Sequence, residues 1–172
     1  MRIFVNSLDG GETSVILFGR PGDFFGELAV IDGLPRSATA VALDSTTLFI
    51  LPRDQFREKM RLSPRLALNF MQLLSRRVRY STRQMDSVVS LPVRQRLASK
   101  LMELAQDYGR PDPLGVCIPL SLTQSNLASL IGATRESTNK CLREFRQSDW
   151  LRFRAGQIII IDPDALRACS SS

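Results

Sequence analysis

The sequence predicts an α+β fold in three successive parts, and three observations carry that prediction. The first 60 residues are short apolar runs broken by Gly, Pro and Asp, a pattern typical of antiparallel strands. A long helical stretch follows over residues 64–91. Residues 121–161 then hold two short amphipathic segments and a hairpin pattern. With 172 residues and 44% apolar content, the chain can bury one substantial core or two small ones, and the change of pattern near Leu91 favours two.

Four runs in the first part are predicted strands, which together make a small antiparallel β domain over residues 1–60. Asp9-Gly10-Gly11 is a hairpin turn signal between the first two. After Pro52, Asp54 is the predicted N-cap of a short helix. The four predicted strands cover residues 2–5, 13–18, 38–43 and 46–51.

A dimerisation helix is predicted over residues 61–91, with Pro64 opening its regular part. One apolar stripe recurs at alternating steps of four and three residues, as in the seam of a two-stranded coiled coil. A neighbouring stripe would pack on the β domain, and the seam would then form a C2 homodimer. The alternative is one wide face buried within a single subunit. The seam consists of Ala67, Met71, Leu74, Val78, Ser81, Met85 and Val88, and the second stripe of Leu66, Phe70, Leu73 and Tyr80.

The third predicted domain spans residues 92–172 and begins at a candidate hinge, Leu91-Pro92. Apolar residues at helical spacing carry a helix from Val93 to Tyr108. The following GRPDPLG, residues 109–115, is predicted to be an exposed loop. At the far end, Asp162-Pro163 is predicted to cap a last short helix.

Two short helices joined by a tight turn are predicted in the middle of this domain. Thr123 is the predicted N-cap of the first helix, and Gly132 sits where the turn needs a positive φ. Thr134 can cap the second helix. Inward-facing residues are predicted to be Leu127, Leu130 and Ile131 in the first helix, and Thr138, Cys141, Leu142 and Phe145 in the second.

The outward side of the second helix carries the residue types that read base edges. Arg and Lys donate to guanine, Glu accepts from cytosine, and Asn pairs with adenine. A hairpin with its turn at Ala155 and Gly156 follows at once, which completes the layout of a winged helix-turn-helix. The alternative is an ordinary solvated charged face. The outward set is Arg135, Glu136, Asn139, Lys140 and Arg143.

Composition agrees with a nucleic-acid partner and argues against an enzyme. Lys and Arg exceed Asp and Glu by 23 − 17 = 6, which suits a polyanion. The chain has no His, the commonest general base, and its three cysteines are scattered without metal-ligand spacing. We therefore expect no catalytic residues, no metal and a reducing, cytoplasmic location. No apolar run predicts a membrane span.

A second candidate site lies around two glycines, a carboxylate and a guanidinium. Gly26-Glu27 and Arg36-Ser37 flank one short connection. The planar fork of an Arg donates two hydrogen bonds to two phosphate oxygens, and a carboxylate accepts from a ribose hydroxyl. By spacing alone, a Glu27–Arg36 salt bridge that closes the turn is the simpler interpretation.

GDFFGELAVIDGLPRSATA and LIGATRESTNKCLREF, in this order, resemble the phosphate-binding cassette and the recognition helix-turn-helix of the CRP/FNR family of bacterial transcriptional regulators. The resemblance implies an antiparallel β-roll, a dimerising helix and a winged helix-turn-helix that binds double-stranded DNA. The chain begins in what looks like the middle of the family's roll, so the roll is expected to be incomplete at its N-terminus. Lys140 stands where many members have Arg.

The resemblance also implies a small effector, with cyclic AMP ahead of cyclic GMP. The sequence lacks the cysteine cluster of iron-sulfur members and the histidine that ligates haem in others, so we expect neither group. Three alternatives remain: a member that no longer binds nucleotide, a nucleotide-binding module whose winged helix contacts proteins, and, with least support, an enzyme. Contact of the 109–115 loop with RNA polymerase rests on analogy alone. The implied effector residues are Gly26, Glu27, Leu28, Arg36, Ser37, Ser81 and Thr82, and the DNA-binding candidates are Thr123, Ser125, Thr134, Arg135, Glu136, Ser137, Asn139 and Lys140.

Overall fold

The computed structural model describes residues 1–6, 12–17 and 22–171. Its first sheet contains β1 (Arg2–Asn6), β2 (Glu12–Leu17) and β3 (Thr39–Val41) in the order β2-β1-β3, with both pairs antiparallel. Three of the four predicted strands are therefore confirmed. The predicted turn at residues 9–11 and the last residue of the second predicted strand lie outside the described residues.

The fourth predicted strand, residues 46–51, is wrong. This segment is irregular, with Phe49 99% exposed and Ile50 90% exposed. Its β-branched and aromatic residues suit a pleated surface, but a strand also needs a neighbour for its backbone hydrogen bonds. In the part of the chain that the structure describes, the small sheet offers this segment no partner strand.

Two short helices accompany the first sheet. Helix α1 (Glu27–Asp32) begins after Gly26, whose φ of 82° is in the left-handed region. Helix α2 (Arg53–Leu62) has Pro52 as its N-cap, so the prediction that Asp54 caps it is wrong. Asp54 lies in the first turn instead, where its carboxylate faces the positive end of the helix dipole.

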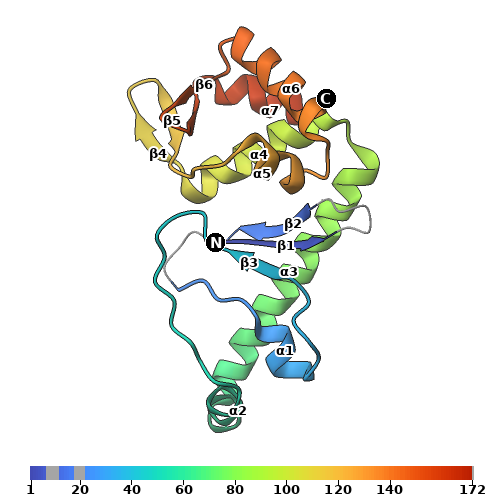
Figure 1. Ribbon diagram of the computed structural model, residues 1–172, viewed down its shortest axis with the longest axis vertical. Helices are drawn as coiled ribbons and strands as arrows, with labels where there is room; N and C mark the ends of the chain where they lie inside the picture. The colour runs from blue at the N-terminus through green and yellow to red at the C-terminus, as the bar shows by residue number, and fades with distance from the viewer. Residues whose placement is uncertain (7–11, 18–21, 172) are drawn as a thin grey trace.

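The predicted long helix is α3 (Pro64–Ser90), which runs beside the first sheet and continues toward the second domain (Figure 1). The Ser63 hydroxyl accepts a hydrogen bond from the Leu66 amide at 3.2 Å and caps its N-terminus. Phe70 stacks on Phe24 and meets the edge of Phe56, each with ring centroids 5.1 Å apart. Phe70 of this stripe therefore packs on the first part of the chain, as predicted, while most of the seam is exposed and its Ala67 and Leu74 are half-buried.

The winged helix holds the main hydrophobic core. Its helices pack around a four-stranded antiparallel sheet of order β4-β5-β7-β6, with Leu97, Leu127, Phe145 and Ile158 fully buried (Figure 1). The expected loop at 109–115 is wrong, since these residues form the β4–β5 hairpin. The elements are α4 (Val93–Tyr108), β4 (Arg110–Asp112), β5 (Gly115–Ile118), α5 (Gln124–Leu130), α6 (Arg135–Gln147), β6 (Leu151–Arg154), β7 (Gln157–Ile160) and α7 (Pro163–Ser171).

Polar contacts at two places, Ser129 on α5 and Tyr80 on α3, join the winged helix to the rest of the chain. Arg2, which pairs with Glu12 at 2.6 Å, also donates to the Ser129 hydroxyl on α5 at 3.4 Å. Across the Leu91-Pro92 break, the buried Lys100 on α4 donates to the Tyr80 hydroxyl on α3 at 2.8 Å. Among the described residues, no helix is long and apolar enough to cross a membrane.

Candidate nucleic-acid interface and effector site

Helix α6 is positioned by its cap and by its buried side. The Thr134 hydroxyl accepts from the Ser137 amide at 3.1 Å and donates to the Ser137 hydroxyl at 2.9 Å. Because four inward residues recur at helical spacing, one side of the helix is fixed against α4, α5 and β6. All four predicted inward residues are confirmed as buried: Thr138, Cys141, Leu142 and Phe145.

The preceding helix α5 and its turn also follow the sequence prediction. Thr123 and Asn126 form a capping box, with side-chain to backbone distances of 3.1 and 3.0 Å. Gly132 has a φ of 59°, and a Cβ at this position would lie 3.0 Å from the Val88 side chain. This turn therefore needs glycine for its conformation and for the close approach of α3.

The opposite side of α6 is open. Arg135, Glu136 and Lys140 are exposed and make no ion pair within the part of the chain that the structure describes. Asn139 is half-buried, and its Oδ1 is enclosed without a hydrogen-bond partner. Of the other DNA-binding candidates, Thr123, Ser125 and Thr134 are exposed, while Ser137 is partly covered.

At the second candidate site, Glu27 is held by a residue that sequence reasoning missed. Its Oε1 lies 2.6 Å from Nη1 of Arg77 on α3, and the Glu27 side chain is only 9% exposed. Arg77 also donates to the Phe24 carbonyl, and its guanidinium lies 4.5 Å from the centre of the Phe24 ring. The simpler interpretation from sequence, a Glu27–Arg36 salt bridge, is therefore replaced by a Glu27–Arg77 pair.

Arg36 contacts the N-cap of α1. Its side chain is exposed, and its guanidinium donates to the Gly26 carbonyl. A Cβ on Gly26 would lie 2.6 Å from that guanidinium and would displace it, and the φ of 82° also favours glycine here. Leu28, which follows Glu27, and Ser37, which follows Arg36, are both exposed. The structure thus gathers Gly26, Glu27 and Arg36 at one end of α1.

Ser81 and Thr82 are exposed on α3, and Thr82 donates to the Val78 carbonyl at 3.1 Å. Ser81 follows Arg77 by four residues, so the two share one side of the helix. The sequence does hold a signal for Arg77, because it lies between Leu73 and Tyr80 in the second apolar stripe of α3. A charge inside an apolar stripe indicates a fixed partner.

These features define a class: a helix-turn-helix protein whose long helix contacts the candidate effector segment through Arg77. Comparison with known proteins agrees. The cyclic nucleotide-binding domain matches residues 1–63, and the Crp-like helix-turn-helix domain matches residues 95–169. A CRP-like cAMP-activated global transcriptional regulator of Mycobacterium tuberculosis is 30% identical over 158 residues, which cover 92% of this chain and 70% of that protein.

Two further similarities point the same way. The cyclic AMP receptor protein of Thermus thermophilus is 30% identical over 158 residues, covering 92% of this chain and 69% of that protein. A crystal structure of a CRP/FNR-family transcriptional regulator, also from Thermus thermophilus, matches with a TM-score of 0.80 and 26% identity, over 99% of this chain and 83% of that one. None of these three proteins is named as an enzyme.

The chain belongs to the CRP/FNR family of transcriptional regulators. It combines a cyclic nucleotide-binding domain with a DNA-binding helix-turn-helix domain. The expected fold, an antiparallel β part followed by a long helix and a winged helix, is confirmed.

Proposed function

We propose that the chain acts as a homodimer whose affinity for specific DNA is set by a cyclic nucleotide, with cyclic AMP ahead of cyclic GMP. The observation that carries this proposal is the Glu27–Arg77 pair, because it ties the effector segment directly to the long helix. A ligand that reaches Glu27 therefore acts on the element that connects the two domains. Effector and DNA sites are then coupled through α3 and its contact with α4 of the winged helix, where Lys100 donates to Tyr80.

The chemistry of the effector site suits a cyclic nucleotide. A ribose hydroxyl can donate to Glu27, which Arg77 holds in place. Arg36 binds only a backbone carbonyl among the described residues, so its fork is available for a phosphate. Ser37 and the exposed hydroxyls of Ser81 and Thr82 are the remaining contact candidates. Both relatives described above are named for cyclic AMP, whereas another, from Synechococcus elongatus, is named a global nitrogen regulator.

The DNA-binding proposal places the N-terminal half of α6 in a major groove. Arg135, Glu136 and Lys140 would contact base edges, and Asn139 would reach adenine after a side-chain rotation. Hydroxyls at the two helix N-termini would bind backbone phosphates, where the helix dipoles also favour negative charge. These phosphate contacts are Thr123, Ser125, Thr134 and Ser137.

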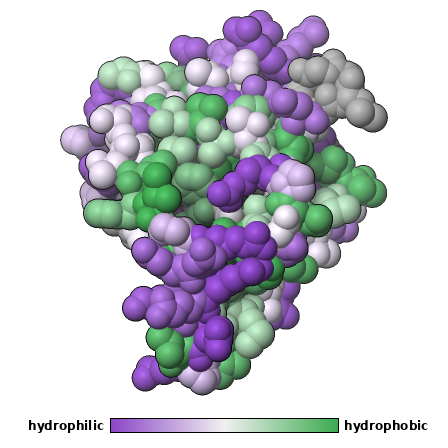
Figure 2. Space-filling view, turned by 60° about the horizontal axis from the view of Figure 1, so that its bottom comes forward, coloured by the Kyte–Doolittle hydropathy of each residue, from purple (hydrophilic) through white to green (hydrophobic). Residues whose placement is uncertain are grey.

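A dimer would present α6 twice, one turn of DNA apart. That spacing is about 34 Å in helix-turn-helix dimers, the catabolite activator protein included. The seam of α3 leaves Met71 53%, Val78 66% and Met85 71% exposed. In the space-filling view, apolar side chains reach the surface over much of the face that is turned toward the viewer (Figure 2). A second copy would cover the apolar seam of the first.

Calorimetry with cyclic AMP and cyclic GMP tests the effector proposal. We expect the chain to bind cyclic AMP and Arg36→Ala to weaken binding by at least about tenfold, because a charge-assisted bidentate contact is lost. Arg65→Ala, an exposed change at the start of α3, is the control. Comparable binding by Arg36→Ala would remove the phosphate clamp, and no binding of either nucleotide would remove the effector assignment.

DNA binding is tested separately by the Arg135→Ala variant. We expect sequence preference to fall while binding to mixed-sequence duplex is retained, because base contacts carry specificity and phosphate contacts carry most affinity. Unchanged preference would contradict the assigned role of Arg135. Duplex binding that hardly depends on salt would favour a winged helix that contacts protein instead.

A further inference from the structure

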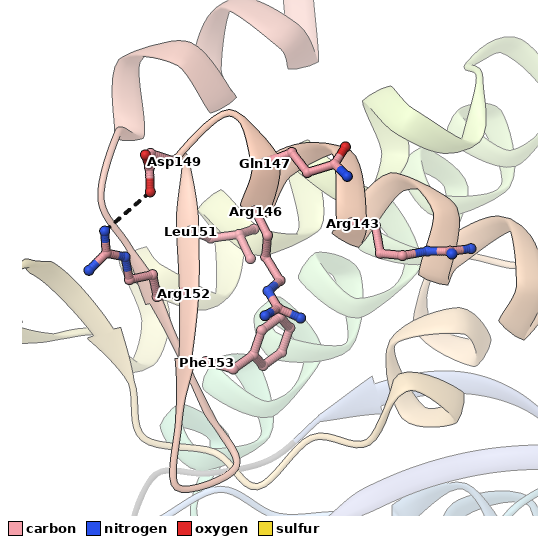
Figure 3. Close-up of a pocket in the computed structure, with 7 residues that line it drawn as sticks. All are labelled: Arg143, Arg146, Gln147, Asp149, Leu151, Arg152 and Phe153. Atoms are coloured by element: carbon pink, nitrogen blue, oxygen red, sulfur yellow. Dashed lines mark hydrogen bonds and ion pairs between the residues drawn. The ribbon is translucent and has the colours of Figure 1, made fainter.

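A basic groove lies between the C-terminal half of α6 and strand β6, and of its residues only Arg143 belongs to the outward set of α6 described above (Figure 3). Its volume is about 480 Å³. Leu151 and Phe153 contribute its apolar lining, and the "α6–β6 groove" is defined here by Arg143, Arg146, Asp149, Leu151, Arg152 and Phe153.

Positive charge dominates this groove, with three guanidiniums against one carboxylate. Arg146 lies over the Phe153 ring, 5.6 Å from its centre, so the ring restrains this side chain. Arg143 and Arg152 lie on opposite sides of Arg146 (Figure 3). Arg143 is exposed and makes no ion pair among the residues described.

Asp149 compensates only part of the positive charge of the groove. Its Oδ1 lies 3.2 Å from Nη2 of Arg152, with the two side chains 72% and 58% exposed. Such an exposed pair contributes little, on the order of 0–1 kcal/mol, so Arg152 can exchange this partner for another anion. The groove is therefore a site with a net positive charge and replaceable internal contacts.

The groove lies next to the side of α6 that is proposed to contact DNA bases. Arg143 follows Lys140 by three residues and therefore lies on the same side of the helix. The 13 residues of α6 extend about 20 Å, whereas the major groove of DNA is about 12 Å wide. When the first turns reach base edges, the C-terminal half must pass the sugar-phosphate backbone that borders the groove.

We propose that the α6–β6 groove binds phosphates of this bordering DNA backbone. Arg143 and Arg152 donate to the phosphates from two sides, and Arg146 supplies charge from the middle. This inference rests on the proposed DNA-binding function. It adds contacts that strengthen binding to every sequence and hold α6 in register, while base selection stays with the N-terminal half of the helix.

The test measures fluorescence anisotropy of full-length protein on a mixed-sequence duplex and on an operator obtained by in vitro selection, over a range of salt. We expect Arg143→Gln and Arg152→Gln to weaken binding to both duplexes by the same factor, on the order of tenfold for a dimer. The slope of log affinity against log salt should become shallower by about one per protomer. Asp149→Asn should act in the opposite direction and tighten binding, because it removes the only carboxylate that defines the groove.

Arg167→Gln is the matched control, because Arg167 also pairs with an Asp three residues away, at 2.6 Å, but on α7. Its salt slope should equal that of the unchanged protein. If the wild-type slope is steep and both groove variants behave like Arg167→Gln, the groove inference is overturned while the proposed function stands. If the wild-type protein itself shows no salt-dependent duplex binding, the proposed function fails first.

Discussion

The winged helix and the part of the chain before it, called here the effector part and ending with α3 at Ser90, differ in how far their apolar side chains are buried. The winged helix encloses a continuous core that runs from Leu97 to Cys169, whereas helices α1, α2 and α3 contain no buried residue. In the described effector part, the buried side chains include Phe4 beside the polar Arg2 and Ser14. One region thus stabilises itself, while the other leaves apolar surface that a partner surface can cover.

The largest expected effect is the destabilisation of the winged helix when the Phe145 side chain is removed. Phe145 is fully buried and stacks on Trp150 with centroids 5.2 Å apart. We expect Phe145→Ala to reduce the free energy of unfolding of the winged helix by about 3–5 kcal/mol, since a large cavity remains. Urea unfolding followed by the fluorescence of Trp150, the only Trp in the chain, measures it.

The matched control lies in the other region. Phe49 is 99% exposed, so Phe49→Ala should change the free energy of unfolding by no more than about 0.5 kcal/mol. Equal losses for the two Phe→Ala changes would contradict the contrast between the regions.

The next largest expected effect is a weaker dimer when a charge is placed in the α3 seam. This change tests whether a second copy covers the exposed apolar surface. We expect Val78→Glu to raise the dissociation constant of the dimer at least about 100-fold, or about 2.7 kcal/mol. Burying two carboxylates that face each other is costly. Sedimentation measures the constant, and Arg79→Glu next to the seam is the control. A dimer unaffected by Val78→Glu would place the interface elsewhere.

The same contrast explains what the sequence could predict. In the winged helix the caps at Thr123 and Thr134, the turn at Gly132 and the four inward residues of α6 were all confirmed. Each depends on contacts within a few residues or on one periodic apolar side. Local patterns are reliable where a short segment buries its own face in a nearby core.

Predictions failed where the outcome depended on distant partners. Residues 46–51 have strand composition but no strand beside them in the described chain. Residues 109–115 join a hairpin whose second strand, β5, also pairs with β7 much later in the chain, as Val116 does with Ile160. Arg77 was missed because its partner Glu27 lies 50 residues earlier. The place of Arg77 inside an apolar stripe indicates that it has a partner, but a single sequence does not say which distant residue that partner is. The domain limits at residues 60 and 91 and the individual contact residues remain predictions.

The junction between the two regions should show a smaller effect. Tyr80 donates to Oε1 of Glu103 at 3.0 Å and accepts from the buried Lys100 at 2.8 Å. We expect Tyr80→Phe to reduce the free energy of unfolding by about 1–2 kcal/mol, because two partly buried hydrogen bonds are lost. Urea unfolding at neutral pH measures the loss, and Ser75→Ala, on the exposed surface of α3, is the control.

The effect of Tyr80→Phe should also depend on pH. Burial, followed by the nearby Glu103, raises the pKa of Tyr80 above its usual value of about 10. Its contribution is therefore fully present below about pH 10 and is lost as the pH rises beyond that, since the unfolded chain ionises first. The stability difference between the wild type and Tyr80→Phe should narrow at alkaline pH. A constant difference would contradict a neutral, buried phenol.

The smallest expected effect is a gain in the stability of the winged helix. The β6–β7 hairpin turns through Ala155 and Gly156, with φ values of 50° and 77°. A two-residue turn with both φ values positive favours Asn-Gly, because Asn tolerates the left-handed region better than Ala. We expect Ala155→Asn to raise the free energy of unfolding by about 0.5–1 kcal/mol, and Ala155→Val to lower it, because a β-branched side chain is most strained there. Trp150 fluorescence reports both changes, and a gain for Val that matches the gain for Asn would show that backbone strain at this turn does not limit the stability of the winged helix.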